Sequence, residues 1–404
     1  MKRHSIIISY ICNIYVTLWL LYNFHWQGVG DFFPILDFFS NLFLGMNLII
    51  SAVFAGLAWK NYMNSPVMQS ILVLVLLFTI YGLISIMQDG KILIRGEGAY
   101  VSSGTYLIGA LRSFLPLCTF YYLTKNGYLT ENFMRYWFWV FLIQSVYLYF
   151  MGRMMLGLSG MDEVRTNNLG YIFVALFPFV CLFDKKPFLQ SVIIFLFLFI
   201  TIMSLKRGAI LTMTLAILFF FWNQAKSLNS IKKIIAIAFF CISLFFLSDF
   251  VGDMYERNDV FQRRIENTLE GRTSGRDEIT SHLLSKYANS NLIYLIFGYG
   301  ADGTIKELRY AHNDWLEMLY DQGVIGFFAY FVFWFVIYRI MRNQFQRKTS
   351  IALFLGVIFI CNFTKTFFSM WFSMANMYIT MPLGYCLAIA ETKVRNNLKL
   401  KRCV

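Results

Sequence analysis

Three short polar stretches in the second half of the chain combine residue types suited to anion binding and proton transfer. They are Lys206-Arg207-Gly208, Gly271-Arg272-Thr273-Ser274-Gly275-Arg276 and His312-Asn313-Asp314. A guanidinium is planar, permanently charged and matched to phosphate oxygens, whereas a neutral imidazole accepts a proton near pH 7. Together these residue types suit chemistry on a phosphorylated substrate.

Each arginine also has a purely structural interpretation. Arg207 is either an interfacial charge at the end of an apolar run or, with Lys206 beside it, half of an anion clamp. Arg276 lies where a helix should begin, so free backbone N–H groups favour an anion there. Arg272 and Arg276 equally fit a solvated basic patch. Arg112 is a further candidate because a charge inside an apolar run is costly unless it faces a cavity or a partner; the alternative places it near the end of a shorter span.

His312 directly precedes a second expected helix start at Asp314. The positive end of that helix should lower the pKa of the imidazole and keep it neutral, although a hydrogen-bonded surface histidine is the alternative. Asp314 is expected to cap the helix while Glu317 reaches back, and either acid is also a candidate for orienting His312. Asn313 belongs to the same motif.

The composition fixes the class of protein that positions these residues. The chain is 58% hydrophobic and only 14% charged, so it has more apolar surface than one core can bury, and the excess must face lipid. A net charge of +13 would suit a nucleic-acid partner, but membrane proteins collect Lys and Arg in cytoplasmic loops. No nucleic-acid partner is therefore predicted. The sequence has no P-loop and no His/Cys cluster with metal-ligand spacing, so neither a cofactor nor a metal is predicted.

Apolar segments predict an all-α bundle of about twelve transmembrane helices. They fall near 5–22, 41–59, 69–87, 105–123, 134–150, 169–183, 188–205, 208–222, 233–251, 323–338, 350–368 and 371–390. Lys and Arg are most frequent in the loops that share a side with both termini, which predicts that both ends are cytoplasmic. Residues 1–251 thus hold nine spans, 252–322 a long outer loop, 323–390 three spans and 391–404 a basic cytoplasmic tail.

The long outer loop is the expected place for function, because long polar loops often carry binding residues. Ser274-Gly275-Arg276-Asp277 should begin a short amphipathic helix within it. Ile279, Leu283, Leu284 and Tyr287 are expected on one face of that helix, against the membrane or the bundle.

Four motifs in this order resemble those of the O-antigen polymerase/ligase superfamily, bacterial inner-membrane glycosyltransferases of the GT-C type. Ser204-Leu205-Lys206-Arg207-Gly208-Ala209 resembles its S-x-R-G-A turn, Ser274-Gly275-Arg276 its S-G-R, Gly298-Tyr299-Gly300 its G-x-G, and His312-Asn313-Asp314-Trp315-Leu316 with Gly323 and Gly326 its H-N-x-[YW]-L…G-x-x-G. The chain departs from the pattern in two places: Lys206 precedes the arginine of the turn, and no aromatic residue follows the S-G-R directly.

The resemblance implies a metal-independent and inverting enzyme at the periplasmic face of the inner membrane. Its donor and acceptor would be oligosaccharides linked to undecaprenyl diphosphate, with membrane lipid around it and a polysaccharide chain-length regulator as a further expected partner. Arg207 and Arg276 would bind the donor diphosphate, and His312 would assist the acceptor hydroxyl. The substrate-binding candidates are Arg112, Lys206, Arg272, Asn313, Asp314 and Glu317.

Two other functions stay open on the sequence. An O-antigen ligase would use the same donor and transfer the polymer to the lipid A core. A flippase for a lipid-linked oligosaccharide also needs many helices and intramembrane arginines. The long outer loop favours an enzyme, and polymerase is preferred over ligase.

Overall fold

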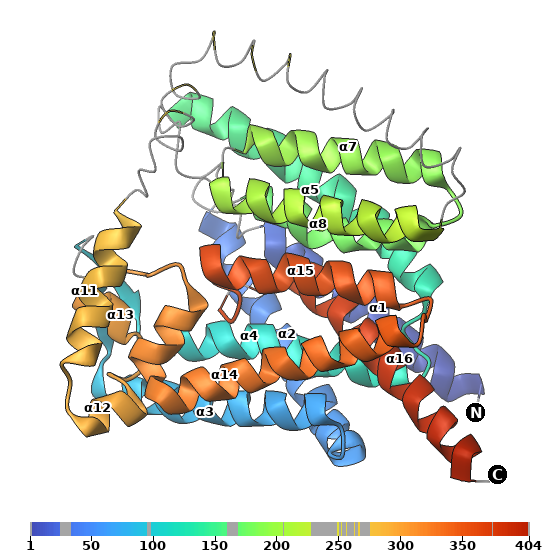
Figure 1. The fold of residues 1–404 in the computed structure, drawn as a ribbon. Coiled ribbons are helices and arrows are strands. Elements are labelled where there is room, and N and C mark those ends of the chain that lie inside the picture. Colours follow the sequence, from blue (N-terminus) through green and yellow to red (C-terminus); the bar gives the residue numbers. More distant parts are fainter. Residues whose placement is uncertain are drawn as a thin grey trace.

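Helices dominate the structure, as the sequence predicts (Figure 1). The computed structural model describes residues 2–24, 34–94, 98–159, 169–204, 206–227, 275–373 and 375–402, with isolated positions between 249 and 266. The helices of the first half are α1 (Lys2–Phe24), α2 (Pro34–Tyr62), α3 (Pro66–Gln88), α4 (Gly104–Lys125), α5 (Glu131–Ser159), α6 (Gly170–Leu176) with the 3₁₀ helix η4 (Phe177–Phe183), α7 (Pro187–Met203) and α8 (Arg207–Ser227). Those of the second half are α11 (Arg276–Ala288), α12 (Leu292–Phe297), α13 (Gly303–Glu307), α14 (Asp314–Gln346), α15 (Ala352–Phe368) and α16 (Met377–Arg402).

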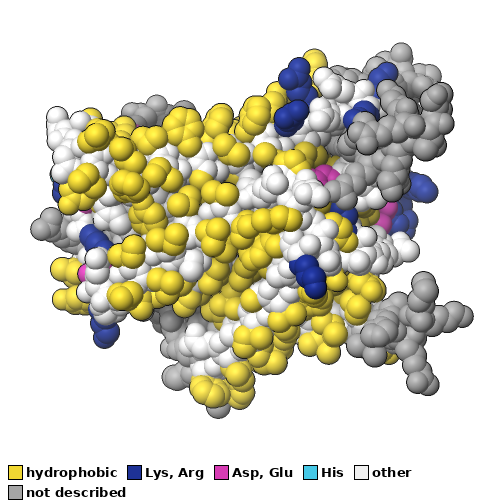
Figure 2. All heavy atoms as spheres, turned by 90° about the horizontal axis from the view of Figure 1, so that it is seen from below, with side chains coloured by type: hydrophobic (Ala, Val, Ile, Leu, Met, Phe, Trp, Pro, Cys, Tyr) yellow, Lys and Arg dark blue, Asp and Glu magenta, His cyan; other side chains and the backbone are white. Residues whose placement is uncertain are grey.

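The described helices include both long and short apolar segments. Phe38–Tyr62, Pro66–Gln88, Gly104–Lys125 and Asp314–Gln346 are long and apolar enough to cross a membrane by length and composition, and shorter apolar helices lie at Gly170–Phe183, Pro187–Met203 and Ala352–Phe368. The predicted count of about twelve spans is not confirmed by this set, and the span expected at 233–251 lies outside the described residues. Hydrophobic side chains cover most of the face that Figure 2 shows, as expected for a protein that contacts lipid.

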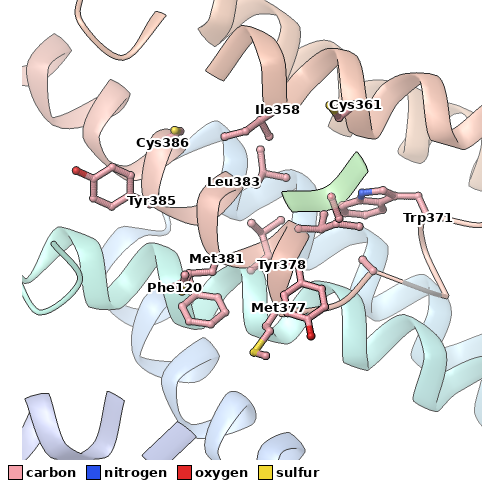
Figure 3. Packing of buried hydrophobic residues seen from close by; sticks show 14 of the residues in the cluster. Phe120, Ile358, Cys361, Trp371, Met377, Tyr378, Met381, Leu383, Tyr385 and Cys386 are labelled. Atoms are coloured by element: carbon pink, nitrogen blue, oxygen red, sulfur yellow. The ribbon is translucent and has the colours of Figure 1, made fainter. Parts of the chain in front are cut away.

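The core lies where α16 packs against α4 and α15. The first half of α16 is buried, and Met377, Met381 and Cys386 have no exposed surface. Figure 3 shows these side chains beside Phe120 of α4 and Ile358 of α15. The span predicted at 371–390 is too long, because α16 begins only at Met377 and the described residues between Trp371 and Asn376 are not helical.

A small β-hairpin, absent from the sequence prediction, joins α3 to α4. Strand β1 (Lys91–Ile94) pairs antiparallel with β2 (Ala99–Ser102) and contacts α13. Ile92 and Ile94 form a small core with Ile305. In Figure 1, α11, α12 and α13 gather at one end of the bundle, and the start of α1 and the end of α16 lie at the opposite end. The cytoplasmic placement of both termini stays a prediction.

Glycines join the α12–α13 segment to a break in α14. Gly323 interrupts α14 with φ 66° and ψ −162°, at the position where the span 323–338 was predicted to begin. Tyr299 and Gly300 donate their backbone N–H groups to the carbonyls of Tyr320 and Asp321 at 2.8 and 2.9 Å. The G-x-G motif is therefore a backbone docking site that fixes the outer segment on α14.

Gly298→Ala should destabilise the protein. Gly298 has φ 73°, and a Cβ there would lie 2.5 Å from both the Asp321 carbonyl oxygen and the Gly323 nitrogen. The backbone strain alone costs about 1–3 kcal/mol. Thermal unfolding in detergent should show a lower Tm than wild type. Gly56→Ala is the control, since a Cβ at Gly56 meets nothing within 4 Å; equal Tm values for Gly298→Ala and this control would contradict the docking role.

Candidate functional site

The carbonyl end of α15 is the point where the predicted motifs meet. Arg276 donates from Nη1 to the Phe368 carbonyl at 3.3 Å, and the Tyr171 hydroxyl donates to the same oxygen at 3.2 Å. A Cβ on Gly208 would collide with the Tyr171 hydroxyl and with Phe368. Gly208 thus lets α8 approach α6 and α15 closely, and Arg207, the first residue of α8, lies directly beside this junction. The turn motif and the S-G-R motif are brought together here.

The glycine of the S-G-R motif, Gly275, lies close to a second arginine, Arg309. Gly275 precedes α11 with φ 76°, and a Cβ there would lie 2.9 Å from the Nη2 atom of Arg309. Two guanidinium groups therefore lie near a helix N-terminus, which itself carries positive partial charge. Such a concentration of positive charge is stabilised by an anion, and backbone N–H groups at the helix start are suited to phosphate oxygens.

His312 lies within this positive region and is half-buried. Burial, together with the charges of Arg276, Lys206 and Arg309, lowers its pKa from 6.5 to about 4. We call Lys206, Arg276 and Arg309 the cationic cluster. The imidazole is neutral at pH 7, as the sequence predicts, but the cause is burial and neighbouring cations rather than the helix end alone. A neutral imidazole can take a proton from a hydroxyl.

The backbone around His312 is held by α14. His312 has φ 54°, an unusual left-handed conformation, and its N–H donates to Oε1 of Glu317 at 3.1 Å. Glu317 thus reaches back as predicted. The cap itself is Asn313, whose Oδ1 accepts from the N–H groups of Trp315 and Leu316 at 3.0 and 3.3 Å, so the cap predicted at Asp314 is wrong by one residue.

Asp314 instead fastens the segment that follows α15. It is fully buried, accepts the Tyr330 hydroxyl at 2.5 Å and accepts the Trp371 N–H at 3.0 Å. These bonds position the start of α14 against residues 369–373. Asp314 thus fixes the start of α14, and its role in orienting His312 stays a prediction.

Arg112 lies within α4 and lines a cavity of about 330 Å³. Its guanidinium donates to the Tyr22 hydroxyl at 2.6 Å and to the Ser373 carbonyl at 2.5 Å. Arg112 is thus inside a helix rather than at its end. It belongs to this cavity, whereas Arg207 and Arg276 belong to the Phe368 junction. Arg272 and Ser274 lie outside the described residues.

The helix predicted from the S-G-R motif is α11, with one error in its buried face. Ile279, Leu283 and Tyr287 are buried, but Leu284 is 42% exposed. The predicted face was one residue too wide, since a helix turns about 100° at each residue. The buried stripe packs on Leu316 and Tyr320 of α14 and so fixes Arg276 relative to His312.

Several site residues were not singled out from the sequence. Arg309 is one of them, although its place three residues before His312 is a usable signal. Tyr171 and the Phe368 carbonyl have no sequence signature. Lys365 is 7% exposed, and its Nζ lies 5.8 Å from the centre of the Tyr171 ring.

Residues 192–331 match a family model described as O-antigen ligase. The match includes Arg207, Arg276 and His312 and ends within α14, so it covers the three polar motifs but neither Arg112 nor Phe368. No curated protein matches the chain. Among the described residues, no group of three or more His, Cys, Asp and Glu side chains could hold a metal ion.

Proposed function

We propose that this chain polymerises lipid-linked repeat units into O-antigen or a related surface polysaccharide. The match of residues 192–331 to an O-antigen ligase family model supports its place in the O-antigen polymerase/ligase superfamily. The family match supports a glycosyltransferase-like enzyme of polysaccharide assembly in general. The finer proposal is an undecaprenyl-diphosphate donor used at the periplasmic face of the inner membrane, without a metal. The observation that carries it is the half-buried, neutral His312 beside the cationic cluster.

The cationic cluster suits the leaving group of this reaction. Arg276 and Arg309 near the start of α11, with Lys206 and Arg207 at the start of α8, offer charge and N–H donors to a diphosphate. Charge develops on the diphosphate as the bond to the anomeric carbon breaks. Fixed cations in a partly buried site stabilise that charge more strongly than water does.

His312 is the proposed general base. The acceptor hydroxyl oxygen forms a bond to the anomeric carbon, the bond from that carbon to the diphosphate oxygen breaks, and its electron pair leaves with the diphosphate. The hydroxyl proton passes to the imidazole of His312. Attack from the face opposite the leaving group inverts the anomeric centre, as the family resemblance implies.

The pH dependence should differ between the free enzyme and the enzyme–donor complex. His312 is deprotonated and active above a pKa of about 4 in the free protein. A bound diphosphate offsets the cations that depress this pKa, so the pKa rises in the complex. The acidic limb of kcat/KM should therefore lie near pH 4 and that of kcat at higher pH. Coincident limbs, measured on purified protein between pH 4 and 8, would contradict the assignment of His312 as the base.

A gene deletion distinguishes the polymerase from the ligase, which the match to an O-antigen ligase family model does not separate. The surface polysaccharide of the deletion strain is resolved on a silver-stained gel beside wild type and complemented strains. Lipid A core that carries a single repeat unit, without a ladder, supports the polymerase. Bare core with long polymer accumulating on the lipid carrier means a ligase. An unchanged ladder contradicts both and leaves a transporter or the assembly of an unrelated polymer.

A further inference from the structure

The cavity that Arg112 lines carries an unusual number of acids. Asp302, Glu317 and Asp321 all line it, and each is at least nine-tenths buried. Two of these acids hold the backbone: Oε1 of Glu317 accepts the His312 N–H, and Oδ1 of Asp321 accepts the Thr304 N–H at 2.9 Å. The acids are thus held rigidly by the fold around one space.

Asp302 has an oxygen that nothing in the described part of the chain satisfies. Its side chain is only 6% exposed, and Oδ2 is buried without a hydrogen-bond partner among the described residues. Burial raises the pKa of Asp302 to about 7 despite the nearby charge of Lys306. The hydroxyl of Ser373, also on the cavity wall, is likewise buried and unpaired within the described residues. A buried polar atom left unpaired is costly, so these two atoms point to a ligand rich in hydrogen-bonding groups.

The cavity adjoins the proposed catalytic base. Tyr310, which lines it, has its ring centre 6.3 Å from that of His312. Met370, Phe372 and Ser373 line it too, and they follow Phe368, whose carbonyl binds Arg276. The cavity therefore shares two segments, 309–317 and 368–373, with the surroundings of His312 and Arg276. A ligand in the cavity lies close enough to present a group to His312.

We propose that this cavity binds the terminal sugar of the acceptor. The inference rests on the proposed glycosyl transfer. A volume of about 330 Å³ suits one or two sugar rings. Carboxyl oxygens accept hydrogen bonds from sugar hydroxyls, and the rings of Tyr106, Tyr310 and Phe372 offer apolar faces to the sugar. The donor diphosphate is assigned to the cationic cluster instead.

Asp302→Asn tests the proposal without disturbing the backbone. Asparagine has the same shape and tolerates the φ of 58° at this position. The acceptor probe is the repeat unit released from its lipid by mild acid, and the donor is the intact lipid-linked unit at saturation. Asp302→Asn should raise the KM for the acceptor about tenfold or more. Inhibition by undecaprenyl diphosphate, which reports the donor site, should stay unchanged. The exposed Asp184→Asn is the matched control.

An unchanged acceptor KM, or an equal loss of undecaprenyl diphosphate binding, would overturn the acceptor site. If the wild-type protein extends only lipid A core, polymerisation is the part that fails. The same Asp302→Asn comparison with that core as acceptor then decides the acceptor site separately.

Discussion

His312→Ala should lower kcat for glycosyl transfer about 10²–10⁴-fold, the usual contribution of a positioned general base. The acceptor hydroxyl then loses the imidazole that takes its proton, while the cationic cluster stays intact. Binding of undecaprenyl diphosphate should therefore persist. In cells that carry only the variant, the polysaccharide ladder should disappear at normal protein levels.

Two further variants make this result interpretable. His312 has φ 54°, so alanine also introduces backbone strain, whereas His312→Asn keeps a residue that tolerates this conformation. Both variants should lose activity equally if the imidazole is the base. His282→Ala removes an exposed histidine bound to Glu307 and should leave the ladder intact. A full ladder from either His312 variant would show that another group takes the proton.

Arg276→Gln should lower kcat about 10²–10³-fold, the usual loss when one donor to a developing anion is removed. Arg276 begins α11 and donates to the Phe368 carbonyl, and its charge lowers the pKa of His312. Its guanidinium therefore lies near the proposed base. Arg276→Lys keeps the charge but loses the planar fork, and an intermediate rate is expected. The loss should appear as weaker binding of undecaprenyl diphosphate as well as slower turnover.

Arg342→Gln is the matched control, because Arg342 is exposed near the far end of α14. Equal effects of Arg276→Gln and Arg342→Gln on rate and on diphosphate binding would mean that Arg276 serves only the packing of α11. If Arg207→Ala, Arg276→Ala and His312→Ala each leave polymer length and amount unchanged, the assignment of roles is wrong.

Hydrophobic runs were sufficient to locate most helices, because a helix that meets lipid must be apolar over its length. Local exceptions were not predictable from the same signal. Residues 371–376 are apolar enough to continue a span, yet the Trp371 N–H binds Asp314 rather than a helical carbonyl. The β-hairpin at Lys91–Ser102 is stabilised by Ile305, which lies far away in the chain.

The site was partly predictable for a similar reason. Arg207, Arg276 and His312 are each marked by a local motif, and the fold brings their elements to the Phe368 junction or the adjoining cationic cluster. The remaining features are products of tertiary packing. The Phe368 carbonyl becomes an acceptor only because α6 and α11 meet the end of α15. Asp302 becomes a buried acid only when the outer segment docks on α14, and no motif marks Asp302 itself.

The most direct test uses purified protein in lipid nanodiscs, supplied only with the lipid-linked repeat unit from a deletion strain. Release of undecaprenyl diphosphate and product length are measured together, for wild type and for His312→Asn. The account predicts products that lengthen by whole repeat units, one undecaprenyl diphosphate released for each new linkage, and neither from the variant. Repeat units that are never joined, with no undecaprenyl diphosphate released by the wild-type protein, would contradict it.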